Sequence, residues 1–190
     1  MDMKSESKAT LQLYGIDEQP TQVFGQQCLV ARRLVERGVR FVELLCRNVG
    51  ADRWDQHGDL RNGHSNNAKA VDKPIAGLLK DLKSRGLLDS TLVVWAGEFG
   101  RPPAAQGNGR DHHAAAHTVW MAGGGVKAGT IYGATDEIGY RAVQDPVPVR
   151  DIHATILHLL GLNHRQLSVL HNGRRERLTD FAGQVIETIV

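Results

Sequence analysis

The sequence lacks any long apolar run. No stretch approaches the roughly 18 consecutive apolar residues that a transmembrane helix needs. The N-terminal segment MDMKSESKAT is polar and has no apolar core of the kind found in signal peptides. We therefore expect no membrane span, and the sequence by itself leaves the localisation open.

The net charge is small, and the sequence contains few cysteines. The 190 residues carry a formal net charge of +2, and the basic residues are interleaved with acids. Such a pattern lacks the basic patch of a nucleic-acid-binding surface, so we expect no nucleic-acid partner. The two cysteines, Cys28 and Cys46, lie in apolar surroundings, and their spacing fits neither a zinc knuckle nor a redox pair. We expect two buried free thiols.

Two common catalytic signatures are missing as well. The sequence contains no G-x-S-x-G motif, which positions the serine of many hydrolases. The GGGV stretch at residues 123–126 lacks the glycine spacing and the following helix of a dinucleotide-binding fingerprint. We expect this stretch to be a tight turn after a strand.

What the sequence does contain is a succession of helical and strand patterns. Apolar residues at helical spacing predict helices over about 5–14, 20–38, 68–85 and 149–160. Continuous apolar runs predict buried strands at Val39–Cys46, Thr91–Gly97 and Thr118–Ala122, and shorter strands in the tail segments RERLTD and GQVIETIV.

This order of elements predicts an α/β fold with a mainly parallel sheet flanked by helices. Val39–Cys46 and Thr91–Ala96 should be neighbouring parallel strands, joined by the helix at 68–85 in a right-handed crossover. No domain boundary is visible before about Leu162, and the tail should pack on the same core. We therefore expect a single domain over residues 1–190, with residues 1–20 flexible.

Acidic and imidazole side chains follow the predicted strands. WDQHGD, which contains Asp55 and His57, follows the first strand, and GRDHH, residues 109–113, lies between the second and the third. Ligands of open parallel sheets bind beyond the carboxyl ends of the strands, so we expect these two segments to meet there. Carboxylates and neutral imidazoles together bind zinc, manganese or iron(II).

The candidate metal ligands are Asp55, His57, Glu98, Asp111, His112 and His113. Adjacent side chains on an extended stretch point in opposite directions, so only one of His112 and His113 should be a ligand. We expect Asp55, His57 and one of these two histidines around one ion, with Glu98 and Asp111 as further ligands or as acceptors that orient the imidazoles. His64 and His117 are secondary candidates for metal ligands.

Two arginines, Arg101 and Arg110, flank these candidates. Guanidinium groups bind sulfate or phosphate oxygens bidentately, so both are candidates for binding a substrate oxyanion. Simpler roles remain open for several of these side chains. Asp55 would equally suit a turn of the loop. Glu98 and Arg101 could form an ion pair with a purely structural role. Both arginines could also be charges of a solvent-exposed loop.

Several long motifs occur in an order that resembles a known family. They are FGQQCLVARRLVERGVRFVEL, WDQHGD, LLKDLKSRGLLDSTLVVWAGEFGR, GRDHH, WMAGGGVKAGTIYGATDEIGY and DIHATILHLLGL. Together, from about Val23 to Val190, they resemble a sulfatase-like bacterial family, the family of unknown function numbered 1501, placed in the alkaline-phosphatase superfamily.

The resemblance implies part of a phosphatase- or sulfatase-like fold with a metal site at the sheet edge. Asp55 and His57 match the Asp–His pair of one superfamily metal, and His112 matches the later histidine of that site. The resemblance therefore implies that His112 is the third ligand and that His113 points away. Glu98 stands where the acid of a second site would stand, but Phe99 replaces the histidine beside it, which argues against a second metal. Asp55 and His57 are also closer together than the usual pair, and Pro102 stands where a threonine is typical.

The function implied is a metal-dependent hydrolase acting on a small-molecule or glycan sulfate or phosphate ester. Its cofactor would be a divalent ion, namely zinc, manganese or calcium. Family members are longer and carry the nucleophile region in an N-terminal half, so we expect this chain to be a C-terminal portion without the catalytic nucleophile. Relatives are often exported to the periplasm.

The alternative is a non-catalytic domain of the same fold that binds a metal, a polyanion or a partner chain. A truncated sheet would also leave an edge for self-association.

Overall fold

The computed structural model describes residues 3, 5–46, 54–180 and 182–190. Its contacts cluster into two compact units, residues 1–91 with 104–112 and residues 92–103 with 113–190. Each unit is described by itself, and the single-domain organisation stays a prediction. Four α-helices and three two-stranded antiparallel sheets lie in the described residues, so the composition is mixed α/β. None of these helices is long and apolar enough to cross a membrane.

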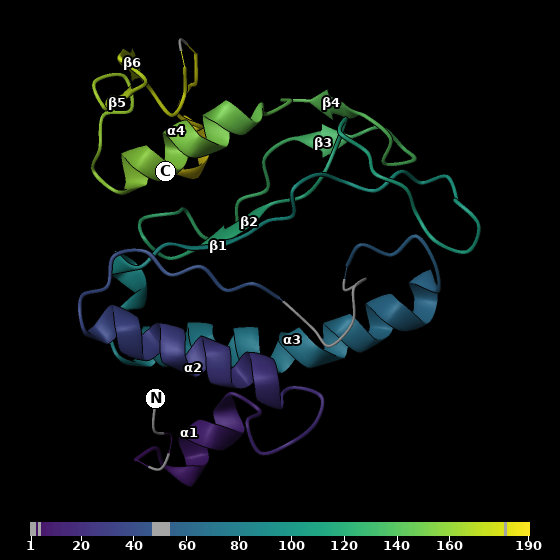
Figure 1. The fold of residues 1–190 in the computed structure, drawn as a ribbon, viewed down its shortest axis with the longest axis vertical. Helices are drawn as coiled ribbons and strands as arrows, with labels where there is room; N and C mark the ends of the chain where they lie inside the picture. The colour runs from purple at the N-terminus through teal and green to yellow at the C-terminus, as the bar shows by residue number, and fades with distance from the viewer. Residues whose placement is uncertain (1–2, 4, 47–53, 181) are drawn as a thin grey trace. The chain divides into compact units, whose positions relative to one another are not determined.

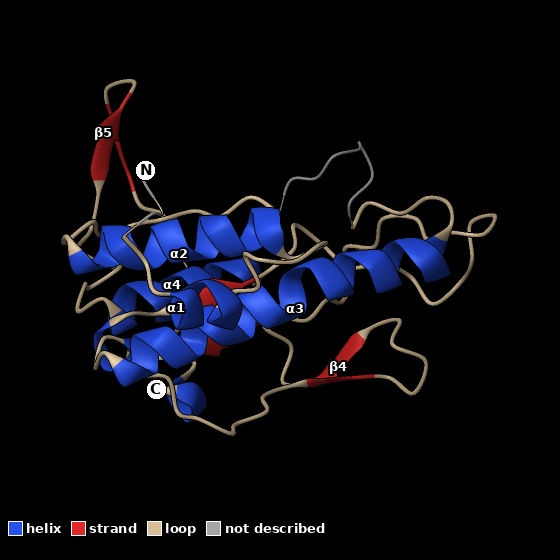
Figure 2. Cartoon of the chain, turned by 90° about the horizontal axis from the view of Figure 1, so that it is seen from below, coloured by secondary structure: helices blue, strands red, loops and turns tan. Residues whose placement is uncertain are grey.

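The first unit is built on helices α1 (Lys8–Leu13), α2 (Gln22–Glu36) and α3 (Leu60–Ser84). α2 packs along α3, and the N-terminal turns of α3 extend past it (Figures 1 and 2). The apolar faces that the periodicity predicted form the core between them. Its buried apolar residues include Phe24, Cys28, Leu29, Ala31, Ala70, Val71, Leu78 and Leu82. The helices predicted at 20–38 and 68–85 are therefore confirmed.

Two glycines let α2 and α3 close on the end of α1. A Cβ atom at Gly77 of α3 would lie 2.5 Å from the carbonyl oxygen of Leu13, and one at Gly25 of α2 would lie 2.3 Å from that of Tyr14. Any larger side chain would push the backbones apart. The approach encloses Tyr14, whose exposed fraction is 0%.

A charged network lies inside this helical core. The guanidinium of Arg32 is almost fully buried and forms ion pairs with Glu36 at 2.6 Å, Glu6 at 3.1 Å and Asp81 at 2.9 Å. The contact between Nε of Arg32 and the carboxylate of Asp81 is an ion pair without hydrogen-bond geometry. Tyr14 donates its hydroxyl to Asp81 at 2.9 Å, and burial together with this carboxylate raises the pKa of the phenol. Arg85 binds the other Asp81 oxygen at 2.7 Å.

The second unit contains the six short strands. β1 (Val93–Trp95) pairs antiparallel with β2 (Trp120–Ala122), and the rings of Trp95 and Trp120 stack at 6.3 Å. The other two sheets are hairpins, namely β3 (Ala134–Thr135) with β4 (Ala142–Gln144) and β5 (Val169–His171) with β6 (Arg174–Glu176).

Helix α4 (Val149–Leu159) buries Ala154, Thr155 and Leu157. It also holds the C-terminal tail, because the hydroxyl of Thr155 accepts the N–H of Ile186 at 3.0 Å. The tail segment GQVIETIV forms the short 3-10 helix η2 (Glu187–Ile189) in place of the expected strand. A second 3-10 helix, η1 (Leu88–Ser90), follows α3 in the first unit.

The expected parallel sheet is not shown. Val39–Cys46 forms no strand, and every strand pair in the described residues is antiparallel. A continuous apolar run indicates a segment suited to burial on both faces, but it does not provide the neighbouring strand whose N–H and C=O groups would complete a ladder. Without that cover, Phe41 is 82% exposed.

Removing the Asp81 carboxylate should destabilise the first unit strongly. The Asp81→Ala variant leaves the buried Arg32 without one of its counter-charges, and breaking such a pair typically costs about 3–5 kcal/mol. Denaturant unfolding of the full chain measures the loss. Glu18→Gln is the control, because the Glu18–Lys73 pair is exposed and should contribute little. Equal stability of the two variants would contradict a central role for the buried network.

Alkaline pH should weaken the fold through Cys28. Burial, with a further contribution from Cys46, raises the pKa of the Cys28 thiol to about 12. The unfolded thiol ionises near pH 8.5, so above that pH the native state binds more protons and stability falls as pH rises, by up to about 1.4 kcal/mol per pH unit. Cys28→Ala should lower stability at neutral pH but reduce the slope between pH 9 and pH 10. An unchanged slope in denaturant titrations would contradict this assignment.

Candidate functional site

The loop before α3 is anchored by a buried glutamine. Gln56 is 5% exposed, and its amide oxygen is hydrogen-bonded to Nδ1 of His64 on α3. Its amide nitrogen fills the space beside Gly63, where a Cβ atom would overlap it at 1.3 Å. The ring of His64 also meets Trp54 edge-on at 5.5 Å. Gln56 therefore fixes the segment on the helix, while its neighbours Asp55 and His57 keep solvent-accessible side chains.

A second segment docks on this loop from about 50 residues further along the chain. Gln106 and Gly109 form a tight turn, with reciprocal backbone hydrogen bonds of 3.1 Å and 2.9 Å. Within this 106–109 turn, Asn108 accepts the N–H of Leu60 on its carbonyl at 3.1 Å and the N–H of Asp59 on its side chain at 3.2 Å. The turn thus satisfies N–H groups at the start of α3, which otherwise lack partners within the helix.

The two segments then run in backbone contact. Arg110 donates its N–H to the carbonyl oxygen of Gln56 at 2.9 Å. Gly109 is buried against the same backbone, and a Cβ atom there would lie 2.1 Å from the carbonyl carbon of His57. Only glycine allows this approach, which brings His112 over the 55–57 loop.

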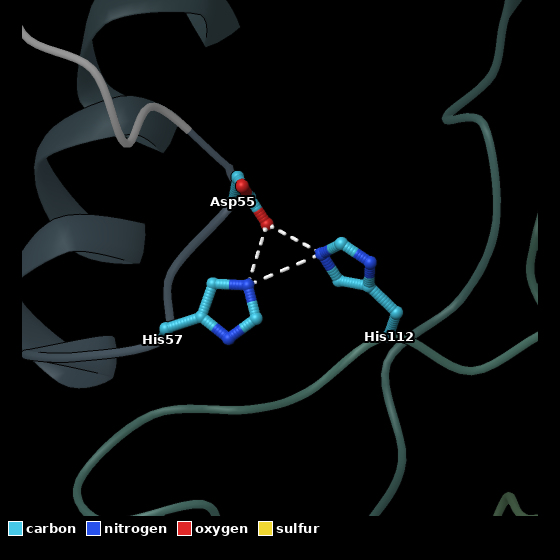
Figure 3. Close-up of side chains that lie close together, drawn as sticks. All are labelled: Asp55, His57 and His112. Atoms are coloured by element: carbon cyan, nitrogen blue, oxygen red, sulfur yellow. Dashed lines mark hydrogen bonds and ion pairs between the residues drawn. The ribbon is translucent and has the colours of Figure 1, made fainter.

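Asp55, His57 and His112 meet as a result (Figure 3). Nε2 of His57 lies 3.1 Å from Nε2 of His112, and Oδ1 of Asp55 lies 3.2 Å and 3.0 Å from these two nitrogens. The three atoms form a nearly equilateral triangle. The side chains are 43% to 47% exposed, so a small molecule can reach them. We call these three residues the triad.

Two neighbours of His112 in the sequence have backbone roles. The carboxylate of Asp111 accepts the backbone N–H of His112 at 2.7 Å, so it orients the main chain of the ligand loop. The guanidinium of Arg110, half-buried, donates to the carbonyl of Gly109 at 3.3 Å. Both belong to the same unit as the triad.

The remaining candidates belong to the second unit. Glu98 pairs with Arg101 at 3.5 Å, which is the structural ion pair that the sequence left open, and Arg101 lies over the Phe99 ring at 5.3 Å. Nε2 of His113 is hydrogen-bonded to the carbonyl of Tyr140 at 2.5 Å. His112 and His113 therefore have separate partners, as expected for adjacent residues.

Sequence reasoning missed the three polar residues that hold the site, namely Gln56, Gln106 and Asn108. Nδ1 of His57 lies 2.7 Å from Oε1 of Gln106. The sequence does not single out any of the three residues. An amide side chain occurs equally well as the hydrogen-bond partner of a metal ligand, as a helix cap and in an exposed loop. The convergence of the two segments was predicted correctly, but its cause is the docked turn and not the edge of a parallel sheet.

A methyl group at Gly109 should break this arrangement. The Gly109→Ala variant forces the 109–112 segment away from His57, and such overpacking typically costs about 1–3 kcal/mol. Urea unfolding measures the cost. Gly58→Ala is the matched control in the same loop, because its Cβ would make an ordinary 3.5 Å contact with Asn108. If both variants were equally stable, the close approach would have no energetic consequence.

Comparison with known proteins places the chain in a family. No curated protein and no solved structure gives a significant match. The family model described as protein of unknown function (DUF1501) matches residues 1–190. Because this match spans the whole sequence, the chain belongs to the DUF1501 family.

Proposed function

We propose that the triad holds one divalent metal ion through Oδ1 of Asp55, Nε2 of His57 and Nε2 of His112. The spacing of these atoms carries the proposal. Ligand atoms at about 2.0–2.1 Å from a tetrahedral zinc ion lie about 3.4 Å apart, and neighbouring ligands of an octahedral ion with similar bonds lie about 3.0 Å apart. The observed separations of 3.0 to 3.2 Å fall between these values.

The ligand types narrow the choice of ion. Two imidazoles and one carboxylate suit zinc, manganese or iron(II). Calcium prefers a shell of six to eight oxygen atoms, so it is the weakest candidate among the divalent ions. Three protein ligands leave coordination positions open, which is typical of catalytic and not of structural sites.

The activity that we propose is hydrolysis of a sulfate or phosphate ester. A divalent ion in such a site polarises the ester oxygen and lowers the pKa of bound water. One carboxylate offsets only half of the charge of the ion, so the site would attract an anionic substrate. Arg110 adds a positive side chain two residues before His112. The sequence motifs that resemble the alkaline-phosphatase superfamily support the same reaction.

Arg101 and Glu98 enter this proposal from the sequence alone. Arg101 is proposed as a second oxyanion-binding side chain, and Glu98 as its charge partner or as a further ligand. Asp111 is proposed as an acceptor that orients the ligand loop. The alternative function, metal binding without catalysis, keeps the same three ligands.

Metal titration of the full chain tests the proposal. Zinc and manganese should bind with one equivalent per chain, and calcium much more weakly. Asp55→Ala, His57→Ala and His112→Ala should each lower the affinity at least 100-fold, because a directly bound ligand is lost, whereas outer partners typically account for about 10–100-fold. His113→Ala is the control and should bind like the unmodified chain.

Hydrolysis is measured on the metal-loaded chain with an aryl sulfate and an aryl phosphate. Turnover that disappears in His57→Ala and persists in His113→Ala supports the hydrolase. Stoichiometric metal binding without turnover supports the non-catalytic alternative. Equal metal affinity of His57→Ala and His113→Ala would overturn the metal site itself.

A further inference from the structure

Gln106 contacts the nitrogen of His57 that faces away from the triad. Its amide oxygen lies 2.7 Å from Nδ1 of His57, while Nε2 of the same ring faces His112 and Asp55. An amide oxygen only accepts hydrogen bonds, so this contact is a hydrogen bond when Nδ1 of His57 carries the hydrogen. A neutral imidazole protonated at Nδ1 has a lone pair at Nε2, which is the form that a metal ion needs.

The position of Gln106 is fixed by the backbone around it. The 106–109 turn is closed by its own two hydrogen bonds and is tied to residues 56–60 through Asn108 and Arg110. The same short segment continues to His112. One docked turn therefore presents both a ligand and the partner of another ligand, and their spacing does not depend on a mobile side chain alone.

We propose that Gln106 is a positioning residue that holds His57 in the Nδ1–H tautomer and so directs its Nε2 toward the triad. The consequence for metal binding rests on the proposed function, whereas the tautomer is a property of the metal-free chain. Metal-bound histidines typically donate their other N–H to a carbonyl or carboxylate, and loss of that partner costs about 10–100-fold in metal affinity.

The tautomer is measured first, on the full chain stripped of metal with a chelator. Nitrogen-15 NMR of the imidazoles, at a pH where His57 is neutral, should show hydrogen at Nδ1. Gln106→Leu should move it toward Nε2, and Gln106→Glu should keep it at Nδ1 because a carboxylate also accepts. Gln12→Leu, on the exposed face of α1, is the control and should change nothing. Hydrogen at Nε2 in the unmodified chain, or no change in Gln106→Leu, would overturn the inference.

Zinc affinity of the same variants separates positioning from a general structural role. Gln106→Leu should bind zinc about 10–100-fold more weakly, with its melting temperature close to that of the unmodified chain, and Gln106→Glu should restore binding. Equal losses in both variants, accompanied by equal destabilisation, would overturn positioning in favour of a structural role. A chain with the Nδ1–H tautomer that binds no zinc would refute the proposed metal site and leave the assignment of Gln106 to His57 supported.

Discussion

The ion pair between Arg32 and Asp81 is the constraint on which the first unit depends. It joins α2 to α3 inside the core, with Tyr14, Glu36, Glu6 and Arg85 completing the set of partners. Two opposite charges in a buried setting tolerate little displacement, because separation leaves each of them desolvated and unpaired. The pair therefore fixes the position of α3 along α2. That helix is the element whose first turns support the triad.

The site uses the opposite end of α3 in a different way. There the two segments are held together by backbone hydrogen bonds, and the absence of a side chain at Gly109 lets their backbones approach closely. The side chains of the triad are exposed. The buried amide of Gln56 and the backbone contacts of the 106–109 turn hold the loops, while the carboxylate and imidazoles of the triad remain accessible. This separation suits a binding site, because the groups that would meet a ligand are not needed to hold the fold together.

The chemistry of the triad follows from its ligand types and its geometry together. The three ligand atoms lie 3.0 to 3.2 Å from one another, which is hydrogen-bonding distance in the absence of an ion. The same spacing fits one face of a coordinated metal ion. Gln106 links the metal-free and the metal-bound forms of the site, because the Nδ1–H tautomer that we propose for His57 leaves Nε2 without a hydrogen on the side of the triad.

The sequence by itself determined the helices α1, α2, α3 and α4 and the identity of the triad, because helical periodicity and side-chain chemistry are local properties. Tertiary structure decided the rest. Helix α3 begins at Leu60, about two turns before the expected start, because Asn108 supplies the hydrogen bonds that LRNGHSNN does not provide locally. Val39–Cys46 has the composition of a strand, but pairing needs a partner that its own residues do not specify. Gln106 became visible as a partner of His57 only once the chain had folded, because the contact joins residues 49 positions apart.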